Sequence, residues 1–454
     1  MAVQQSDSNI DLDLDLGAEG AFKLMTKSFY AYRWRIAILL CLITTINYID
    51  RQALTVAAPL LMEEFSISAS QYGLITSGFL FAYGFGQLIC GPLIDRLGSK
   101  RAFSLAVIAW SIAGMLHAFG RGFVSFFSFR VLLGLTEAAN FPAATKAIAE
   151  WFPQSERSLA VGIFTMGPGL GAIIAPPLIA GIIMLWGWQA AFLIPGAIGF
   201  VWLILWNKWF HLPADHPGLP EDERQFILAN TESARTGSDG KWARDERPWY
   251  WSLRYKEVWG LMISRFVSDG AFYFFVFWLP LYLTQERGFD LKAIALFAWI
   301  PFLAVDIGGI TGGYIGKILI DKGMSLDRSR KLVIWVGAVL VLAAMPAAST
   351  DSAGLALALI AVAMFAIQFK ASSMFTLPAD LFPARDVGTV WGMYGAVGSF
   401  GGMVFSSLAG WTIDNYSWTP LFVAAACMHI VSAALINVFV PRIELLTESR
   451  AARA

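Results

Sequence analysis

Apolar runs long enough to cross a lipid bilayer recur along almost the whole chain of 454 residues. Each run is close to the ~20 residues that a helix needs to cross a hydrocarbon core about 30 Å thick. Six runs precede and six follow a polar segment at residues 211–256. The sequence therefore predicts an all-α membrane protein with twelve transmembrane helices in two bundles of six. The runs begin near Arg35, Tyr72, Ala102, Val124, Leu159, Gln189, Val258, Ala293, Leu332, Gly354, Val387 and Pro420.

Composition excludes several classes of protein. Hydrophobic residues make up 57% and charged residues 15% of the chain, and the mean hydropathy is +0.59, values that do not fit a soluble domain of this length. The formal net charge of +0 argues against a nucleic-acid partner, which would leave a basic face. Cys41, Cys90 and Cys427 lie in apolar runs without paired spacing, so neither disulfides nor a metal site are indicated. With no nucleophile motif or phosphate loop either, we expect no enzyme activity and no cofactor.

Basic residues in the short loops set the expected orientation. Lys and Arg are enriched in the loops on the side of both termini and of the polar segment, which is the cytoplasmic side by the positive-inside rule. The opposite side has only Arg121, Arg287 and Lys292. We expect cytoplasmic tails at residues 1–32 and 442–454, helical bundles at 33–210 and 257–441, and a cytoplasmic linker at 211–256.

The two halves of the chain resemble each other. Glu150–Pro153 is echoed by Asp380–Pro383, and Leu93–Arg96 is echoed by Leu319–Lys322. Such repeats predict two pseudo-symmetric bundles, and many transporters bind substrate between their repeats, near the membrane midplane.

Two adjacent charges interrupt the first apolar run. Asp50 and Arg51 lie within the run from Ile36 to Leu61. A charge at the bilayer centre costs about 2.5–3.5 kcal/mol on insertion scales, so such residues usually face a protein interior or a watered cavity and mark a pathway. The alternative is an ion pair that only locks two helices together.

A layer of polar side chains is expected at the midplane, near the middle of several spans. Arg51 suits a planar carboxylate because its guanidinium donates two parallel hydrogen bonds. Tyr83 and Gln87 are four residues apart on one helix face, where they would bond polar groups of a substrate or, alternatively, bond a neighbouring helix. The layer comprises Asp50, Arg51, Tyr83, Glu137 and Tyr273.

Glu137 shares a helix face with Arg130, seven residues earlier. An ion pair between them would hold the acid charged until a competing charge arrives, which makes Glu137 a candidate proton carrier. A permanent structural pair is the alternative, because ion-pair networks without a transport role are also common.

The segment Gly91–Arg101 resembles the loop signature of the major facilitator superfamily, between the second and third spans. The resemblance implies a conformational gate formed by Gly91, Asp95, Arg96, Gly98 and Arg101. Other charged residues within the spans are interpreted as gate or packing groups rather than substrate contacts. They are Arg265 and Asp269, near the start of the seventh span, and Asp306, deep in the eighth.

A narrower resemblance covers nearly the whole chain. The segments Asn47–Arg51, Leu135–Pro142 and Arg265–Asp269 resemble the anion:cation symporter family, and within it the bacterial hexuronate and aldonate carriers. The resemblance implies a monomeric, multi-pass protein of the bacterial inner membrane that imports a sugar acid, a small organic anion, together with protons. It assigns the substrate carboxylate to Arg51 and the protons to Asp50 and Glu137.

The expected function is therefore proton-coupled sugar-acid import by alternating access. A sodium-coupled anion carrier, an efflux carrier and a non-transporting nutrient sensor remain as alternatives. Arg130 is grouped with the proton-coupling residues. The expected substrate-binding residues are Tyr48, Arg51, Tyr83, Gln87, Asn140, Tyr273, Trp278, Gln368, Lys370 and Ser373.

Lys370 lies in the middle of the tenth span, at the repeat position of Asn140. An ammonium at that depth needs an anion. The anion is either a resident acid, such as Glu137 or Asp306, or a second negative group on the substrate. In the second case Arg51 and Lys370 would grip the two ends of a dianion such as an aldarate.

Overall fold

The computed structural model describes residues 32–231, 249–382 and 384–446. Within these ranges the chain is helical and has no strand. The first six spans are α2 (Tyr32–Glu64), α3 (Ala69–Leu97), α4 (Ser99–Leu116), α5 (Phe123–Glu137) with α6 (Asn140–Trp151), α7 (Gln154–Trp186) and α8 (Ala190–Trp209). The last six are α10 (Lys256–Arg287), α11 (Leu291–Phe297) with α12 (Ile300–Asp321), α13 (Leu326–Leu340) with α14 (Ala344–Ala347), α15 (Ala353–Met374) with α16 (Leu377–Leu381), α17 (Ala384–Asn415) and α18 (Thr419–Phe439).

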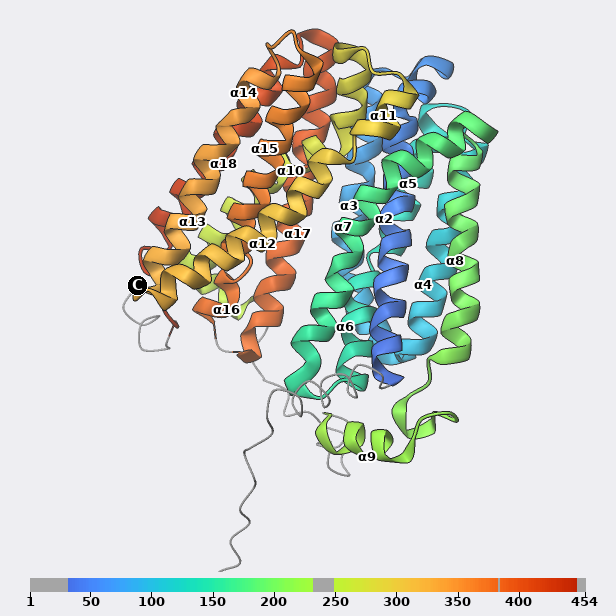
Figure 1. Cartoon of the computed structure of the whole chain (residues 1–454), viewed down its shortest axis with the longest axis vertical. Helices are drawn as coiled ribbons and strands as arrows, with labels where there is room; N and C mark the ends of the chain where they lie inside the picture. The colour runs from blue at the N-terminus through green and yellow to red at the C-terminus, as the bar shows by residue number, and fades with distance from the viewer. Residues whose placement is uncertain (1–31, 232–248, 383, 447–454) are drawn as a thin grey trace, which may run out of the picture.

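The helices form two bundles that stand side by side (Figure 1). Ten of the spans are long and apolar enough to cross a membrane by length and composition, and α3 and the α5–α6 pair complete the first bundle. The expected architecture of twelve spans in two bundles is confirmed. Most of the expected tails and the linker residues 232–248 lie outside the described ranges.

The linker helix α9 (Glu221–Asn230) is attached to the first bundle (Figure 1). The Glu223 carboxylate accepts hydrogen bonds from the backbone N–H groups of Tyr32 and Arg33, at 2.9 and 3.1 Å, so it caps the start of α2. A carboxylate there satisfies unpaired N–H groups and faces the positive end of the helix dipole. The Arg33 guanidinium also pairs with Glu156 of α7 at 2.6 Å. This end of the molecule is called the linker end below.

At the opposite end, α3 of the first bundle bonds α10 and α17 of the second. Tyr72 Oη donates to the Phe277 carbonyl at 2.7 Å, and Ser77 Oγ donates to the Met403 carbonyl at 2.7 Å. The helices approach closely at glycine, since a Cβ on Gly73 would lie 2.6 Å from the Ser406 carbonyl oxygen. Polar bonds and small residues are the usual means of holding membrane helices together. This end is therefore closed.

Asp414, near the end of α17, adds a cap across the same interface. Its carboxylate accepts the backbone N–H of Ala69 at 3.0 Å and of Ser70 at 2.7 Å, at the start of α3. One bundle thus supplies the helix cap of the other, and the bond must break if the halves separate at this end.

Asp414→Ala removes both acceptors from the closed end. Loss of a helix cap costs about 0.5–2 kcal/mol, so we expect this end to open between about twofold and about thirtyfold more often. In a chain whose three native cysteines are replaced, Ser77→Cys should then react faster with a bilayer-impermeant maleimide added on that side. Asp351→Ala, which removes an exposed carboxylate from the loop between α14 and α15, is the control. Equal labelling in both variants would show that Asp414 does not hold the end closed.

Candidate functional site

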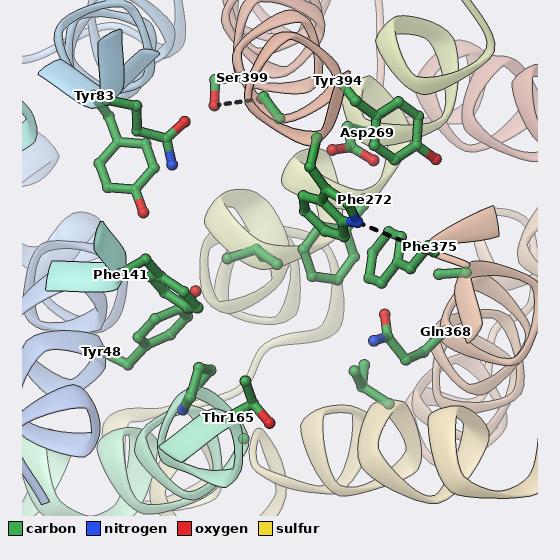
Figure 2. A pocket seen from close by; sticks show the side chains of 18 of the residues that line it. Tyr48, Tyr83, Phe141, Thr165, Asp269, Phe272, Gln368, Phe375, Tyr394 and Ser399 are labelled. Carbon is green, nitrogen blue, oxygen red and sulfur yellow. Dashed lines mark hydrogen bonds between the residues drawn. The ribbon is translucent and has the colours of Figure 1, made fainter. Parts of the chain in front are cut away.

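A cavity of about 1690 Å³ lies between the two bundles. The first bundle lines it with α2, α3, α6 and α7, and the second with α10, α12, α15, α17 and α18. Figure 2 shows Tyr48 and Tyr83 on one wall and Gln368 and Phe375 on the facing wall. The lining reaches Ile94, near the linker end of α3. Because the other end is closed by α3 and α17, the cavity opens toward the linker end.

Arg51, which lines the cavity, forms a buried ion pair with Glu137 behind it. Arg51 donates from Nε and Nη2 to Glu137 Oε2, at 3.1 and 2.8 Å, and their side chains are 5% and 0% exposed. Helix α5 ends at Glu137 and α6 begins at Asn140, so the acid lies at a break in its span. The second carboxylate oxygen, Oε1, is buried and has no hydrogen-bond partner among the described residues.

Three aromatic rings enclose the guanidinium of Arg51. Its Cζ atom lies 4.5 Å from the ring centroid of Tyr48, 4.9 Å from that of Phe79 and 4.8 Å from that of Tyr83. Aromatic faces attract a cation, more strongly when it is desolvated. The rings therefore fix the position of Arg51 while it remains in contact with the cavity.

The expected ion pair between Arg130 and Glu137 is wrong. Arg130 instead donates from Nη2 to the backbone carbonyl of Arg51 at 2.8 Å. Seven residues correspond to a rise of about 10.5 Å, and helical side chains tilt toward the N-terminus, so the Arg130 side chain leads away from Glu137. Arg51, from a different helix, takes the place of Arg130.

Asp50 is buried but faces away from the cavity. It is 4% exposed, and a Cβ built on Gly114 of α4 would lie 4.0 Å from its Cγ. Its Oδ2 atom has no hydrogen-bond partner in the described part of the chain. The two neighbouring charges of α2 therefore point in different directions, Arg51 to the cavity and Asp50 into the first bundle.

The other expected binding residues divide into two groups. Tyr48, Tyr83, Gln87, Tyr273, Gln368 and Lys370 line the cavity. The structure places the remaining three elsewhere, because their helix faces turn toward neighbouring helices. Asn140 donates to Thr44 of α2 at 3.2 Å, Trp278 donates to Ser406 of α17 at 3.0 Å, and Ser373 is 1% exposed.

Lys370 bonds neither of the acids considered for it. Its ammonium donates to Ser432 Oγ at 2.7 Å and to the His429 carbonyl at 3.3 Å, and its Nζ lies 3.4 Å from His429 Nδ1. All these partners are on α18. Although Lys370 borders the cavity, it is 1% exposed and its head group is directed into the second bundle.

Arg265 and Asp269 pair on α10 and border the cavity nearer its open end. The Nε atom of Arg265 lies 2.5 Å from Asp269 Oδ2, and its Cζ lies 4.4 Å from the Phe375 centroid and 4.7 Å from the Tyr394 centroid. Both residues line the cavity. Through these ring contacts Arg265 of α10 is linked to Tyr394 of α17 and to Phe375, the residue that follows α15.

The expected gate loop is described in part. Gly91 lies within α3, the side chain of Asp95 lies outside the described residues, and Arg96 and Arg101 are exposed. Gly98 joins α3 to α4 with φ at +77°, a conformation that favours glycine.

Several residues that line the cavity were not among the expected binding residues. Asp306, interpreted from the sequence as a gate or packing group, lines the cavity. Thr165, Phe272, Tyr394 and Ser399 line it as well. Tyr394 and Ser399 stand among the glycines of the eleventh span, a signal of close helix approach that does not reveal which side chains face the cavity. In the described residues, no three His, Cys, Asp or Glu side chains group as a metal site.

Comparison with known proteins gives consistent matches. The chain matches the family model described as the Major Facilitator Superfamily over residues 40–373 and 322–453. It is 34% identical over 405 residues to the hexuronate transporter of Escherichia coli K12, covering 89% of this chain and 93% of that protein. It is 37% identical over 313 residues to the galacturonate transporter of Dickeya chrysanthemi, covering 68% and 89%. The probable galactarate/D-glucarate transporter GarP of E. coli K12 is 30% identical over 412 residues, covering 88% and 93%.

Solved structures share the fold. A bacterial homolog of the human lysosomal transporter Spinster, inward-facing and occupied, superposes with a TM-score of 0.68 at 19% identity, covering 93% of this chain and 97% of that one. The inward-open xylose transporter XylE from E. coli gives 0.64 at 18% identity, covering 89% and 95%. At these identities the likeness concerns the fold alone.

The buried pair generates a prediction about stability. Removing one partner leaves an uncompensated buried charge, which costs about 3–5 kcal/mol. Arg51→Leu and Glu137→Leu should each lower the thermal unfolding midpoint of the detergent-purified protein, and the double variant should recover most of the loss.

The exposed pair of Lys317 and Asp321 is the matched control. Both side chains are more than half exposed, at 71% and 56%, so a cycle of leucine variants there should show little coupling. A double variant of Arg51 and Glu137 that loses the sum of the two single effects would contradict the predicted interaction.

Proposed function

The chain belongs to the Major Facilitator Superfamily, a family of transporters rather than enzymes, and from that premise we propose that it is a proton-coupled symporter that imports a sugar acid. Relatives named as hexuronate and galacturonate transporters support this substrate class. The observation that carries the proposal is the buried ion pair between Glu137 and Arg51, the member of the pair that lines the cavity.

Arg51 is the group that binds the substrate carboxylate. A guanidinium can hold a carboxylate through two parallel hydrogen bonds, and the donors needed for this are now engaged by Glu137. The substrate and Glu137 therefore compete for the same cation. Tyr48, Tyr83 and Gln368 border the same cavity, where they would contact the sugar.

This competition is the proposed source of coupling. Protonation of Glu137 removes its charge and releases Arg51 for the substrate, so the anion and the proton bind together. When the proton leaves, Glu137 reclaims Arg51 and the substrate is expelled. Asp50, buried on the adjacent position of α2, is a second candidate proton site, and Arg130 positions α2 by bonding the Arg51 carbonyl.

The two bundles, residues 33–210 and 257–441, rock about the cavity as units in this proposal. The enrichment of Lys and Arg in the loops of the linker end supports a cytoplasmic location for that end in a bacterial cell. The closed α3–α17 interface then faces the outside, and the structure corresponds to the inward-facing state. Outward opening requires release of the Asp414 cap and closure of the linker end, to which the loop at Gly98 and the pair Arg265–Asp269 contribute.

The proposal is tested by transport into proteoliposomes. Purified protein is reconstituted and supplied with labelled galacturonate, with and without an inward proton gradient and with and without sodium. We expect accumulation that requires the proton gradient and is indifferent to sodium. Accumulation that follows the sodium gradient would replace proton coupling with sodium coupling, and the absence of uptake for hexuronates and aldonates alike would reject the substrate class.

Glu137→Gln separates coupling from binding. A permanently neutral amide imitates the protonated acid but cannot release a proton, so we expect exchange of internal for external substrate to persist while proton-driven accumulation falls to background. Glu286→Gln, which neutralises an exposed glutamate near the end of α10, should retain accumulation. If Glu137→Gln still concentrates substrate against a gradient, the proton is carried elsewhere, with Asp50 the next candidate.

A further inference from the structure

Asp306 is an unpaired acid on the cavity wall of a protein proposed to carry anions. It lies midway along the span Leu291–Asp321, is half-buried and lines the cavity. Among the described residues its carboxylate has no hydrogen bond or ion pair, unlike Glu137 and Asp269, which are both paired with arginine. A resident negative charge at that depth is costly, so its presence calls for a function.

The Asp306 carboxylate reaches across the interface to α7 of the first bundle. A Cβ added to Gly169 would overlap all three atoms of the carboxyl group, so the glycine provides the space that the acid occupies. Two residues later, a Cβ on Gly171 would lie 2.6 Å from the Cβ of Tyr48, whose ring centroid is 4.5 Å from the Arg51 guanidinium. One short segment of α7 thus separates Asp306 from the site of Arg51.

The wall around Asp306 offers hydrogen-bond acceptors. The two oxygens of the Asp306 carboxylate, at the cavity wall, accept hydrogen bonds from hydroxyl groups. This part of the cavity therefore suits the hydroxyl groups of a sugar.

The cations of the second bundle do not neutralise Asp306. Arg265 is paired with Asp269 and lies about two and a half turns from the linker end of α10, whereas Arg51 lies about five turns from the linker end of α2. Lys370 donates its bonds to α18. At the level of Arg51, the facing wall therefore carries an unpaired carboxyl group and no described cation aimed at it.

We propose that Asp306 limits the substrate to sugar acids with a single carboxylate. Arg51 holds that carboxylate, and Asp306 accepts hydrogen bonds from hydroxyl groups toward the other end of the molecule and repels a second carboxylate there. Discrimination of this kind relies on an unfavourable contact with the wrong ligand as much as on contacts with the right one. The inference rests on the proposed function, because it identifies which sugar acids the same site accepts.

Competition assays in proteoliposomes test the inference. Proton-driven uptake of labelled galacturonate is inhibited by unlabelled galacturonate, by galactonate and by galactarate, which has a carboxylate at each end. For the native chain we expect galactarate to inhibit at least about tenfold more weakly than galacturonate. Asp306→Asn keeps a hydrogen-bonding side chain and removes the charge, so it should strengthen galactarate inhibition at least about fivefold relative to galacturonate. Asp351→Asn, the same change in an exposed loop, should leave the ratio of the half-inhibitory concentrations of galactarate and galacturonate unaltered.

Each failure has a distinct signature. If labelled galacturonate is not accumulated at all, the proposed function fails, whatever Asp306 does. If uptake is normal but galactarate inhibits the native chain as strongly as galacturonate, or Asp306→Asn leaves the ratio unchanged, the role of Asp306 is overturned while the function stands. If Asp306→Asn elutes as aggregate in gel filtration, the test uses the native chain and Gly169→Ala, which displaces the carboxylate without removing it. The quantity compared is the half-inhibitory concentration of galactarate divided by that of galacturonate. Gly169→Ala should lower this ratio relative to the native chain.

Discussion

The ion pair between Arg51 and Glu137 is the interaction on which the candidate site depends. Both charges are withdrawn from water, at 5% and 0% exposure, and a pair of this kind is tolerated only because each partner compensates the other. Three aromatic rings hold the guanidinium in place beside the cavity. The only inexpensive ways to separate the two charges are to protonate the acid or to supply another carboxylate, and proton symport of an organic acid supplies both.

The ends of the molecule complement this chemistry. At one end α3 and α17 are joined by hydrogen bonds and by the Asp414 cap, while the cavity opens at the other. Most of the bonds at the closed end are single contacts between polar groups, each worth about 0.5–1.5 kcal/mol net. A difference in substrate affinity between the two states of a few kcal/mol is therefore sufficient to shift the population between them.

The bundles and the depth of Arg51 could be predicted from the sequence, because hydropathy and the position of a residue along its span are local properties. The direction of each side chain could not, because it depends on how neighbouring helices rotate. Arg51 faces the cavity whereas Asp50, the adjacent residue, faces α4. Glu137 pairs with α2 rather than with Arg130 of its own helix, and Lys370 turns to α18.

The most direct test of the central claim is the number of protons taken up when substrate binds. Calorimetric titration of the detergent-purified protein with galacturonate, in two buffers of different ionisation enthalpy, measures that number. If the substrate displaces a charged Glu137 from Arg51, the acid must take up a proton, and the linkage predicts uptake of about one proton per substrate near neutral pH. That uptake should disappear in Glu137→Gln. Binding without proton uptake in the native chain, or uptake that persists in the variant, would contradict the account.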